Sequence, residues 1–224
     1  MTEGFRVFDR RRAVDLEMAR RYRSVAVANV SDSMSRMAAG GARLRPLHAG
    51  GHMAGPALTV KTRPGDNLMI HMALNLARPG DVIVVDAGGD LTNALFGELM
   101  LGVAEKKQLG GVVIDGAVRD IAAIRASSLP VYAAGITHRG PYKDGPGEVN
   151  GPIAIDGMVV KPGDLALGDD DGFVCVPFDA VAAVYERAAS KRDQERAAAE
   201  SIVAGTDDRS HIERRLRELG CAFE

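Results

Sequence analysis

The alternation of short apolar runs with amphipathic segments in the middle of the chain is the feature that most constrains its fold. The runs "VIVVD" at 82–86 and "VVID" at 112–115 are rich in β-branched residues and read as strands. The segments at 68–77 and 93–108 carry apolar residues at helical spacing, the second despite containing two glycines. Strands separated by helices in this rhythm pair largely in parallel within a buried sheet. The sequence therefore predicts an α/β protein.

Segments on both sides of this region extend the prediction to the whole chain. Residues 1–40 read as a helical arm, with Ser31 or Asp32 as the N-cap of its second helix. Further along, short runs separated by Gly, Pro and Asp turns indicate strands without intervening helices. Residues 178–224 contain a long amphipathic helix and then a shorter one. No linker divides the chain, so we expect one domain across all 224 residues, with its α/β core at 41–177.

Charge and composition exclude several classes of partner. The formal net charge is −2, so the chain has no overall positive field to attract nucleic acid. No run reaches the ~18 apolar residues of a membrane span, and the N-terminus lacks a secretory pattern. Cys175 and Cys221 are isolated, which argues against a disulfide framework or a zinc site. We expect a cytoplasmic protein that binds neither nucleic acid nor membranes.

Two aspartates follow the predicted strands directly. Asp86 comes after "VIVV" and Asp115 after "VVI". Ligands of α/β proteins collect outside the carboxyl ends of the strands, so we expect both carboxylates at the edge of a site. The alternative is that each is a turn or N-cap aspartate.

Arg119 and Asp120 stand at the predicted start of a helix, in "GGVVIDGAVRDIAAI". An arginine near the positive end of a helix dipole is unfavourable unless an anion joins it. Its guanidinium can grip a carboxylate through two hydrogen bonds, and an adjacent aspartate can hold a divalent cation directly or through water. An anionic substrate and a metal would explain the pair. A surface ion pair with a capping aspartate is the alternative.

A second acidic candidate, Glu98, lies in "FGELM", with twenty residues between it and Arg119. Twenty residues are enough for one helix and one strand, which could return the chain to the same end of the sheet and bring Glu98 near Arg119. The neighbouring Gly97 would let a ligand approach the backbone N–H groups. A solvated helical glutamate is the alternative.

Other polar residues give weaker signals. His48 and His52 lie in a Gly-rich segment that does not favour a metal site, and His71 reads as a packed helical residue. The run Asp169–Asp171 is more typical of a hairpin turn than of a cation site. Lys61 is the lysine best placed for a Schiff base, but no second cation or apolar pocket accompanies it in the sequence.

Four motifs occur in this order along the chain: "RPGDNLMIHMAL", "PGDVIVVD", "FGELM" and "GGVVIDGAVRD". They carry a resemblance to one known family, which extends over roughly residues 20–220. The chain resembles the class II 4-hydroxy-4-methyl-2-oxoglutarate aldolases, whose relatives include the regulator of ribonuclease activity A. The resemblance implies an αββα sandwich similar to the swivelling phosphohistidine domain. It also implies a homotrimer or dimer of trimers with sites between subunits. The implied reaction is a metal-dependent retro-aldol cleavage that releases pyruvate, often accompanied by oxaloacetate decarboxylation.

The resemblance also implies roles for particular residues. Arg119 would bind and polarise the pyruvyl group of a small 2-oxo acid, and Asp120 would anchor Mg²⁺ or Mn²⁺, partly through water. Glu98 matches a position at which many family members carry Asp and would also serve the metal, partly via water. Glu195, in "KRDQERAAAE", matches an acidic residue that the neighbouring subunit supplies.

The backbone around the acidic candidate has an implied role as well. The amides of Leu99 and Met100, next to Gly97 and Glu98, would receive the substrate carboxylate. Independently of the resemblance, both reactions leave a pyruvate enolate, whose negative oxygen needs a cation beside it.

Two other functions remain open from the sequence. One is a non-catalytic regulator that binds a ribonuclease with the same core, because a fold does not determine a function. The arm at 1–40 and the helices at 178–224 favour an aldolase, since the regulators resemble the compact core. The other is a lyase that acts on a different 2-oxo acid.

Overall fold

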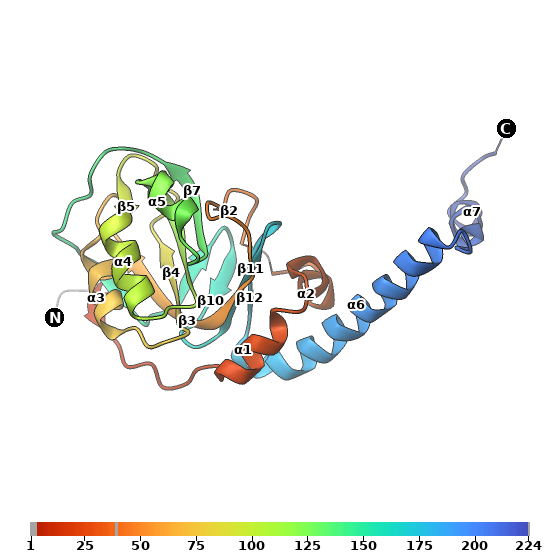
Figure 1. Ribbon diagram of the computed structural model, residues 1–224, viewed down its shortest axis with the longest axis horizontal. Helices are drawn as coiled ribbons and strands as arrows, with labels where there is room; N and C mark the ends of the chain where they lie inside the picture. Colours follow the sequence, from red (N-terminus) through yellow and green to blue (C-terminus); the bar gives the residue numbers. More distant parts are fainter. Residues whose placement is uncertain (1–3, 39, 224) are drawn as a thin grey trace.

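The computed structural model describes residues 4–38 and 40–223 (Figure 1). Its helices are α1 (Leu16–Tyr22), α2 (Val27–Ser33), α3 (Leu68–Leu76), α4 (Glu98–Lys106), α5 (Ile121–Ala126), the 3₁₀ turn η1 (Phe178–Ala180), α6 (Val181–Val203) and α7 (Ser210–Glu218). Its strands are β1 (Phe5–Val7), β2 (Arg45–Pro46), β3 (Met53–Thr62), β4 (Val82–Asp86), β5 (Ala94–Phe96), β6 (Gly111–Val118), β7 (Val131–Ile136), β8 (Gly147–Val149), β9 (Ile153–Ile155), β10 (Met158–Val160), β11 (Leu165–Asp169) and β12 (Gly172–Val176).

A mixed sheet forms the centre of the molecule. Its main path runs β1-β8-β3-β4-β6-β7-β2, with β5 paired to β6 and β11 paired to β3 and β12. The three joins β3–β4, β4–β6 and β6–β7 are parallel, and the chain crosses between these strands through α3, α4 and α5. Parallel strands require such crossovers, so this region confirms the predicted strand–helix rhythm.

Both faces of the sheet are buried, which explains why its strands are apolar throughout. Along β4, Ile83 and Val85 face the core under α3, α4 and α5, while Val82 and Val84 face a second core. β11, β12, β9 and β10 close that second core, and α1, α2 and α6 pack outside them. The layers therefore run helix, sheet, sheet, helix (Figure 1), and the predicted α/β fold is confirmed.

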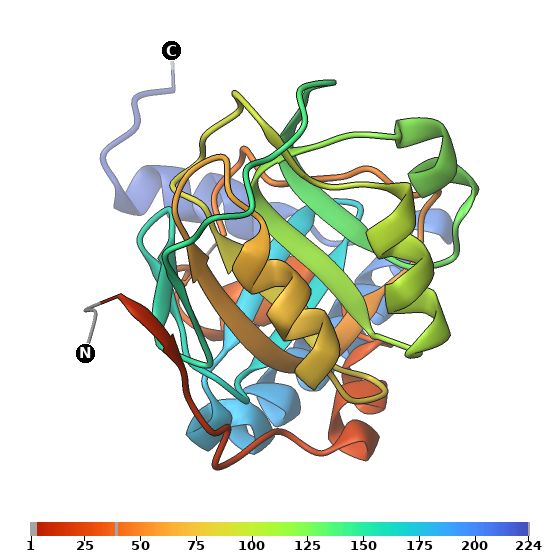
Figure 2. The same ribbon diagram turned by 90° about the vertical axis from the view of Figure 1, so that its left-hand side faces the viewer.

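The prediction of a helical arm over residues 1–40 is wrong in part. The described chain begins with β1, which lies parallel to β8 at the edge of the sheet (Figure 2). The helices α1 and α2 follow, but α2 starts after Ala26, so Ser31 and Asp32 lie inside it rather than capping it. The apolar spacing indicated the helices correctly and missed the strand.

The predicted helix over 93–108 is also corrected. Residues 94–96 form the buried strand β5, paired with Ala117 and Val118 of β6, and α4 begins at Glu98. The run "ALF" is apolar enough to be buried in either structure, so its periodicity could not separate a strand from a helix turn. The strand predicted at 112–115 is longer than expected, because β6 continues to Val118.

The C-terminal residues form a long helix and then a shorter one, as the sequence predicted, and most of both helices is unpacked. The first turns of α6 bury Val184 and Ala188 against the core, and the rest of α6 leads away from the body of the molecule (Figure 1). Ile212 and Leu216 of α7 stay exposed. None of the helices in the described ranges is both long and apolar enough to cross a membrane.

Candidate active site

A cavity of about 250 Å³ lies where the end of β6 meets the start of α4. Four parts of the chain line it: the start of α3, residues 94–100, the Arg119–Asp120 pair, and the loop at 141–143. The strands β5 and β6 are parallel neighbours, so their carboxyl ends deliver the second and third of these parts to the same edge of the sheet. This is the position at which α/β proteins bind ligands.

Arg119 and Asp120 form the charged corner of the cavity. The Arg119 amide donates to the Phe96 carbonyl at 3.0 Å, which ties the end of β6 to the end of β5. Asp120 then adopts the left-handed conformation, with φ 60° and ψ 43°, before α5 begins. Its Oδ2 lies 3.6 Å from Arg119 Nε, and the two side chains are 42% and 39% exposed. A non-glycine residue in this conformation is uncommon and is concentrated at functional sites.

The start of α4 is in direct contact with this corner. The Glu98 amide donates to Asp120 Oδ2 at 2.9 Å. A Cβ added to Gly97 would lie 2.5 Å from that same Oδ2 and 3.0 Å from Arg119 Cγ. Any side chain at position 97 would therefore push the Asp120 carboxylate away. The constraint comes from this contact and not from the backbone, since the φ of Gly97, −160°, is ordinary extended backbone.

Two amides at the start of α4 remain available to a ligand. The first four N–H groups of a helix have no partner within the helix. Here Asp120 takes the Glu98 amide and the Gly97 carbonyl takes the Leu101 amide. Across residues 4–38 and 40–223, no hydrogen bond is formed by the amides of Leu99 and Met100. Two free donors at the positive end of a helix favour an anion.

A second group of polar side chains lines the cavity, and sequence reasoning assigned none of them to a site: it interpreted His71 as a packed helical residue and passed over Asn67 and Lys143. Asn67 is 4% exposed and donates to the Leu95 carbonyl at 3.1 Å, whereas its Oδ1 has no partner among the described residues. His71 and Lys143 also line the cavity. Partial burial lowers the pKa of His71, and the positive charge of Lys143 lowers it further. No sequence pattern indicates a role for Lys143, because it lies in a loop.

The structure places several other candidates outside the cavity. Asp115 is buried within β6, where Arg43 grips it through two hydrogen bonds of 2.8 Å. Burial raises the pKa of Asp115 and Arg43 opposes that shift. Asp86 pairs with Lys61 at 3.3 Å. Asp115 is not at a strand end because β6 continues past it, whereas Asp86 does end β4 but accepts from the Gly88 amide at 3.1 Å, as in the turn alternative. Neither aspartate lines the cavity, so the prediction that they flank this site is wrong, and Lys61 does not line it either.

The weaker signals have structural explanations. His48 is buried edge-on against Tyr132, with its Nδ1 3.2 Å from both backbone polar atoms of Val131. Asp169 ends β11 at the predicted hairpin turn and accepts a hydrogen bond from the Val27 amide. Within the ranges that the structure describes, no three His, Cys, Asp or Glu side chains gather as a metal site.

The two glutamates predicted for the site lie apart from the cavity lining. The Glu98 side chain is exposed, although its backbone amide contacts Asp120. Glu195 lies on α6, where it accepts a hydrogen bond of 2.6 Å from Asn29 Nδ2 and stands 3.8 Å from Lys191. A role for Glu195 at the site of another subunit stays a prediction.

Comparison with known proteins identifies the family. The RraA-like family model, described as Aldolase/RraA, matches residues 27–175. The chain belongs to the RraA-like family. The match covers the strands β2 to β11, the helices α3 to α5 and the whole cavity lining, so the RraA-like residues are those that build the candidate site.

RraA-like relatives carry two kinds of name. A protein of Halalkalibacterium halodurans with the provisional name 4-hydroxy-4-methyl-2-oxoglutarate aldolase is 35% identical over 194 residues, covering 85% of this chain and 92% of the relative. A crystal structure from Pseudomonas syringae pv. tomato is 25% identical, with a TM-score of 0.78 over 87% of this chain and 96% of that one. Streptomyces coelicolor RraAS2, described as an unusual member of the RNase ES inhibitor RraA protein family, is 27% identical, with a TM-score of 0.75 over 82% and 96%.

The RraA-like cavity contains a carboxylate oxygen that could bind a hard divalent cation. Asp120 uses Oδ2 for the Glu98 amide, while its Oδ1 makes no hydrogen bond within the described part of the chain. Mg²⁺ prefers oxygen ligands and commonly binds through one or two carboxylates while keeping several waters. An exposed carboxylate with one free oxygen fits that coordination chemistry.

Proposed function

We propose that this protein is a divalent-metal-dependent lyase that cleaves 4-hydroxy-4-methyl-2-oxoglutarate, or a related 4-hydroxy-2-oxo acid, and releases pyruvate. We propose oxaloacetate decarboxylation as a second reaction of the same site. The observation that carries the proposal is that the Arg119–Asp120 corner contacts Gly97 and Glu98 at the start of α4, where the next two amides, of Leu99 and Met100, are free within the same cavity. The provisional aldolase name of the H. halodurans relative supports it.

The pyruvyl half of the substrate would bind between these groups. The amides of Leu99 and Met100 would hold its carboxylate, and the Arg119 guanidinium would hold its 2-oxo oxygen. In the cleavage, the 4-hydroxyl group gives its proton to a base such as water, C4 becomes a carbonyl carbon, and the electrons of the C3–C4 bond leave the enolate of pyruvate, whose charge gathers on that oxygen until C3 takes up a proton. The fixed positive charge of Arg119 then stabilises the transition state more than the ground state.

The metal would be Mg²⁺ or Mn²⁺, and Asp120 would hold it. When bound, it would supply Lewis-acid stabilisation of the enolate oxygen beside the charge of Arg119. Glu98 would serve it partly through water, and Glu195 of a neighbouring chain would complete the site in a trimer or dimer of trimers. The exposed position of Glu98 and the extension of α6 from the body of the molecule support such a shared site (Figure 1).

The remaining half of the substrate would face Asn67, His71 and Lys143. Lys143 carries a positive charge and suits a second carboxylate, and the unpaired Oδ1 of Asn67 suits a hydroxyl donor. A dicarboxylic 4-hydroxy-2-oxo acid has both groups. This part of the cavity therefore favours a dicarboxylate over a neutral aldol substrate.

The direct test is pyruvate release, coupled to lactate dehydrogenase, from 4-hydroxy-4-methyl-2-oxoglutarate and from oxaloacetate. We expect release from both in Mg²⁺, loss of release in excess EDTA, and recovery when Mg²⁺ or Mn²⁺ is restored. Failure of the folded protein to release pyruvate from either compound, with metal present, would refute the proposal.

The second candidate is a regulator that binds a ribonuclease without catalysis. The similarity to RraAS2 over 82% of this chain favours it. Inhibition of a purified ribonuclease E-type enzyme by this protein, together with no pyruvate release, would establish the regulator.

A further inference from the structure

One loop beside the cavity is fastened to the rest of the molecule by a single buried carboxylate. We propose that Asp66 is a positioning residue that fixes residues 139–145, here called the wall segment, and so places Lys143 for substrate binding. The inference rests on the proposed function, because it assigns Asp66 a role in how that site holds its substrate. Asp66 itself does not line the cavity.

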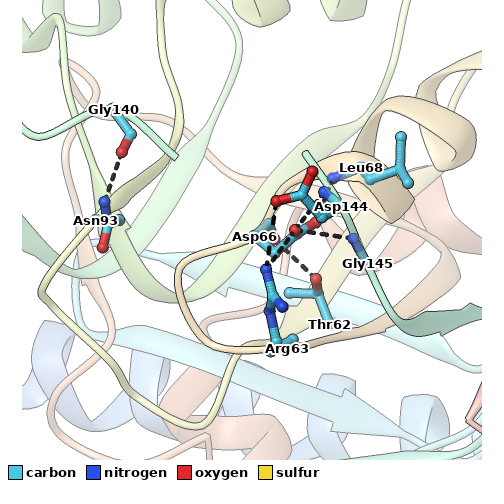
Figure 3. A network of polar contacts seen from close by, with 8 residues as sticks. All are labelled: Thr62, Arg63, Asp66, Leu68, Asn93, Gly140, Asp144 and Gly145. Carbon is cyan, nitrogen blue, oxygen red and sulfur yellow. Dashed lines mark hydrogen bonds and ion pairs between the residues drawn. The ribbon is translucent and has the colours of Figure 1, made fainter. Parts of the chain in front are cut away.

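Asp66 is fully buried, and both of its carboxylate oxygens accept hydrogen bonds from neighbouring residues (Figure 3). Its Oδ1 accepts from the Leu68 amide at 2.9 Å, at the start of α3. Its Oδ2 accepts from the amides of Asp144 at 2.7 Å and Gly145 at 2.9 Å, and from Arg63 Nη2 at 3.1 Å. One side chain thus joins α3 to the C-terminal end of the wall segment.

The rest of the wall segment is attached to the same neighbourhood. The backbone of Tyr142 forms a parallel β-bridge beside Asp66: its amide donates to the Gly65 carbonyl at 2.8 Å, and its carbonyl accepts from the Asn67 amide at 3.0 Å. Asn93 Nδ2 donates to the Gly140 carbonyl at 2.5 Å (Figure 3). These bonds hold the middle and the N-terminal end, so Asp66 and Asn93 fasten opposite ends of the wall segment.

The wall segment bears directly on the cavity. Pro141 and Lys143 line it, and a Cβ built on Gly140 would lie 3.5 Å from Arg119 Nη1. Asp66 also immediately precedes Asn67, whose side chain lines the cavity from α3. A displacement of the wall segment would therefore move Lys143 and loosen the packing behind Arg119, while the Asp120–Glu98 contact remains.

The position of Asp66 requires a side chain that accepts hydrogen bonds at both of its polar atoms. All four groups that point at Asp66 are donors: three backbone N–H groups and one guanidinium. A carboxylate accepts at both oxygens, whereas an asparagine has one accepting oxygen and one NH₂ group. In Asp66→Asn, the NH₂ must face at least one N–H donor, so the substitution breaks the fastening with little change in shape.

A matched control separates positioning from stability. Asp164 is 2% exposed and accepts from the amides of Lys161 at 2.9 Å and Phe178 at 2.8 Å, away from the cavity lining. Asp164→Asn therefore removes a buried carboxylate with the same kind of partners. Asn93→Ala loosens the other end of the wall segment and remains informative if Asp66→Asn folds poorly.

The first measurement is the steady-state rate of pyruvate release by the metal-loaded full-length chain, at a temperature where every variant is folded. We expect kcat/KM to fall about 10- to 100-fold in Asp66→Asn, mainly through a higher KM, since small misplacements of binding groups have effects of this size. Asn93→Ala should change KM in the same direction, and Asp164→Asn should stay within about twofold of the native protein. Equal kinetics for Asp66→Asn and Asp164→Asn would overturn the inference.

The second measurement is independent of activity. Hydrogen exchange followed by mass spectrometry should show faster exchange of the peptide that spans the wall segment in Asp66→Asn, and native exchange there in Asp164→Asn. If the native protein releases no pyruvate, the proposed function fails, and this exchange comparison alone decides whether Asp66 fixes the wall segment. Unchanged exchange in Asp66→Asn would show that it does not.

Discussion

At the scale of single residues, the site depends on where the chain places two charges of opposite sign. Asp120 adopts a left-handed backbone and turns its Oδ2 to the Glu98 amide, which leaves Arg119 beside the free start of α4. Aspartate tolerates this conformation better than most residues. The negative charge of Asp120 at the helix start also offsets the repulsion between Arg119 and the helix dipole.

A pH titration tests the electrostatics of the cavity. The pKa of His71 lies below its ordinary value of 6.5, first because of burial and second because of Lys143. Folding therefore favours the neutral ring, and the stability from this group is complete above pH 6.5 and is lost as the pH falls through the lowered pKa. In Lys143→Met, we expect the pKa of His71 to rise partway toward its ordinary value, as followed by NMR of the imidazole protons. A pKa of His71 that does not change would show that Lys143 does not act on the ring.

Residue chemistry was predicted better than residue surroundings. The Arg119–Asp120 pair was singled out from its motif, because the chemistry of those side chains is local, whereas the close approach of Asp120 to Gly97 was not predicted. Asp115 was misplaced, because the sequence does not show that β6 continues through Gly116 to Val118 and buries the carboxylate against Arg43. The contacts of Asp66 and the position of Lys143 depend on the path of a loop, and the spacing of apolar residues in the sequence does not predict that path.

At the scale of elements, the junction between β5 and α4 shapes the cavity. The buried strand β5 pairs with β6, the chain turns at Gly97, and α4 starts against Asp120. The sequence predicted one continuous helix here, because three apolar residues before Gly97 fit a helix face as well as a strand. The correction matters for function, since it places the helix start, with its free amides, inside the cavity.

Two glycines, one just before α4 and one inside it, give a matched pair of substitutions. In Gly97→Ala, the new methyl group would lie 2.5 Å from Asp120 Oδ2, so we expect the carboxylate to be displaced and kcat/KM for pyruvate release to fall at least about tenfold. In Gly102→Ala, the methyl group meets open space, and we expect native activity with about 1 kcal/mol of added stability, measured by urea unfolding. Native kinetics in Gly97→Ala would contradict the close contact between α4 and Asp120.

At the scale of the whole molecule, the compact body and the C-terminal helices differ in how their apolar residues are buried. The body contains the cavity, whereas Val203 of α6 and Leu219 beyond α7 are exposed apolar residues with little to bury them in one chain. Exposed apolar residues on a protruding helix are typical of contacts between chains. This arrangement agrees with a site that takes Glu195 from a neighbour.

Subunit mixing tests the shared site. We expect the Arg119→Ala and Glu195→Gln proteins each to be nearly inactive, because each lacks one component of every site. Mixed oligomers refolded from both chains should regain pyruvate release, since some sites then combine native Arg119 with native Glu195. Full activity in Glu195→Gln alone would remove this residue from the site, and no recovery on mixing would place both residues in one chain.

The most direct test of the central claim is the kinetics of pyruvate release by Arg119→Ala, with Arg119→Lys as its matched control. We expect kcat/KM to fall about 100- to 1000-fold in Arg119→Ala, because the charge that stabilises the enolate is lost. Recovery in Arg119→Lys should be partial, because an ammonium lacks the planar fork of a guanidinium. Circular dichroism and the unfolding midpoint should match the native protein, since the side chain is 42% exposed. A folded Arg119→Ala protein with native kinetics in Mg²⁺ would contradict the assignment of this cavity as the active site.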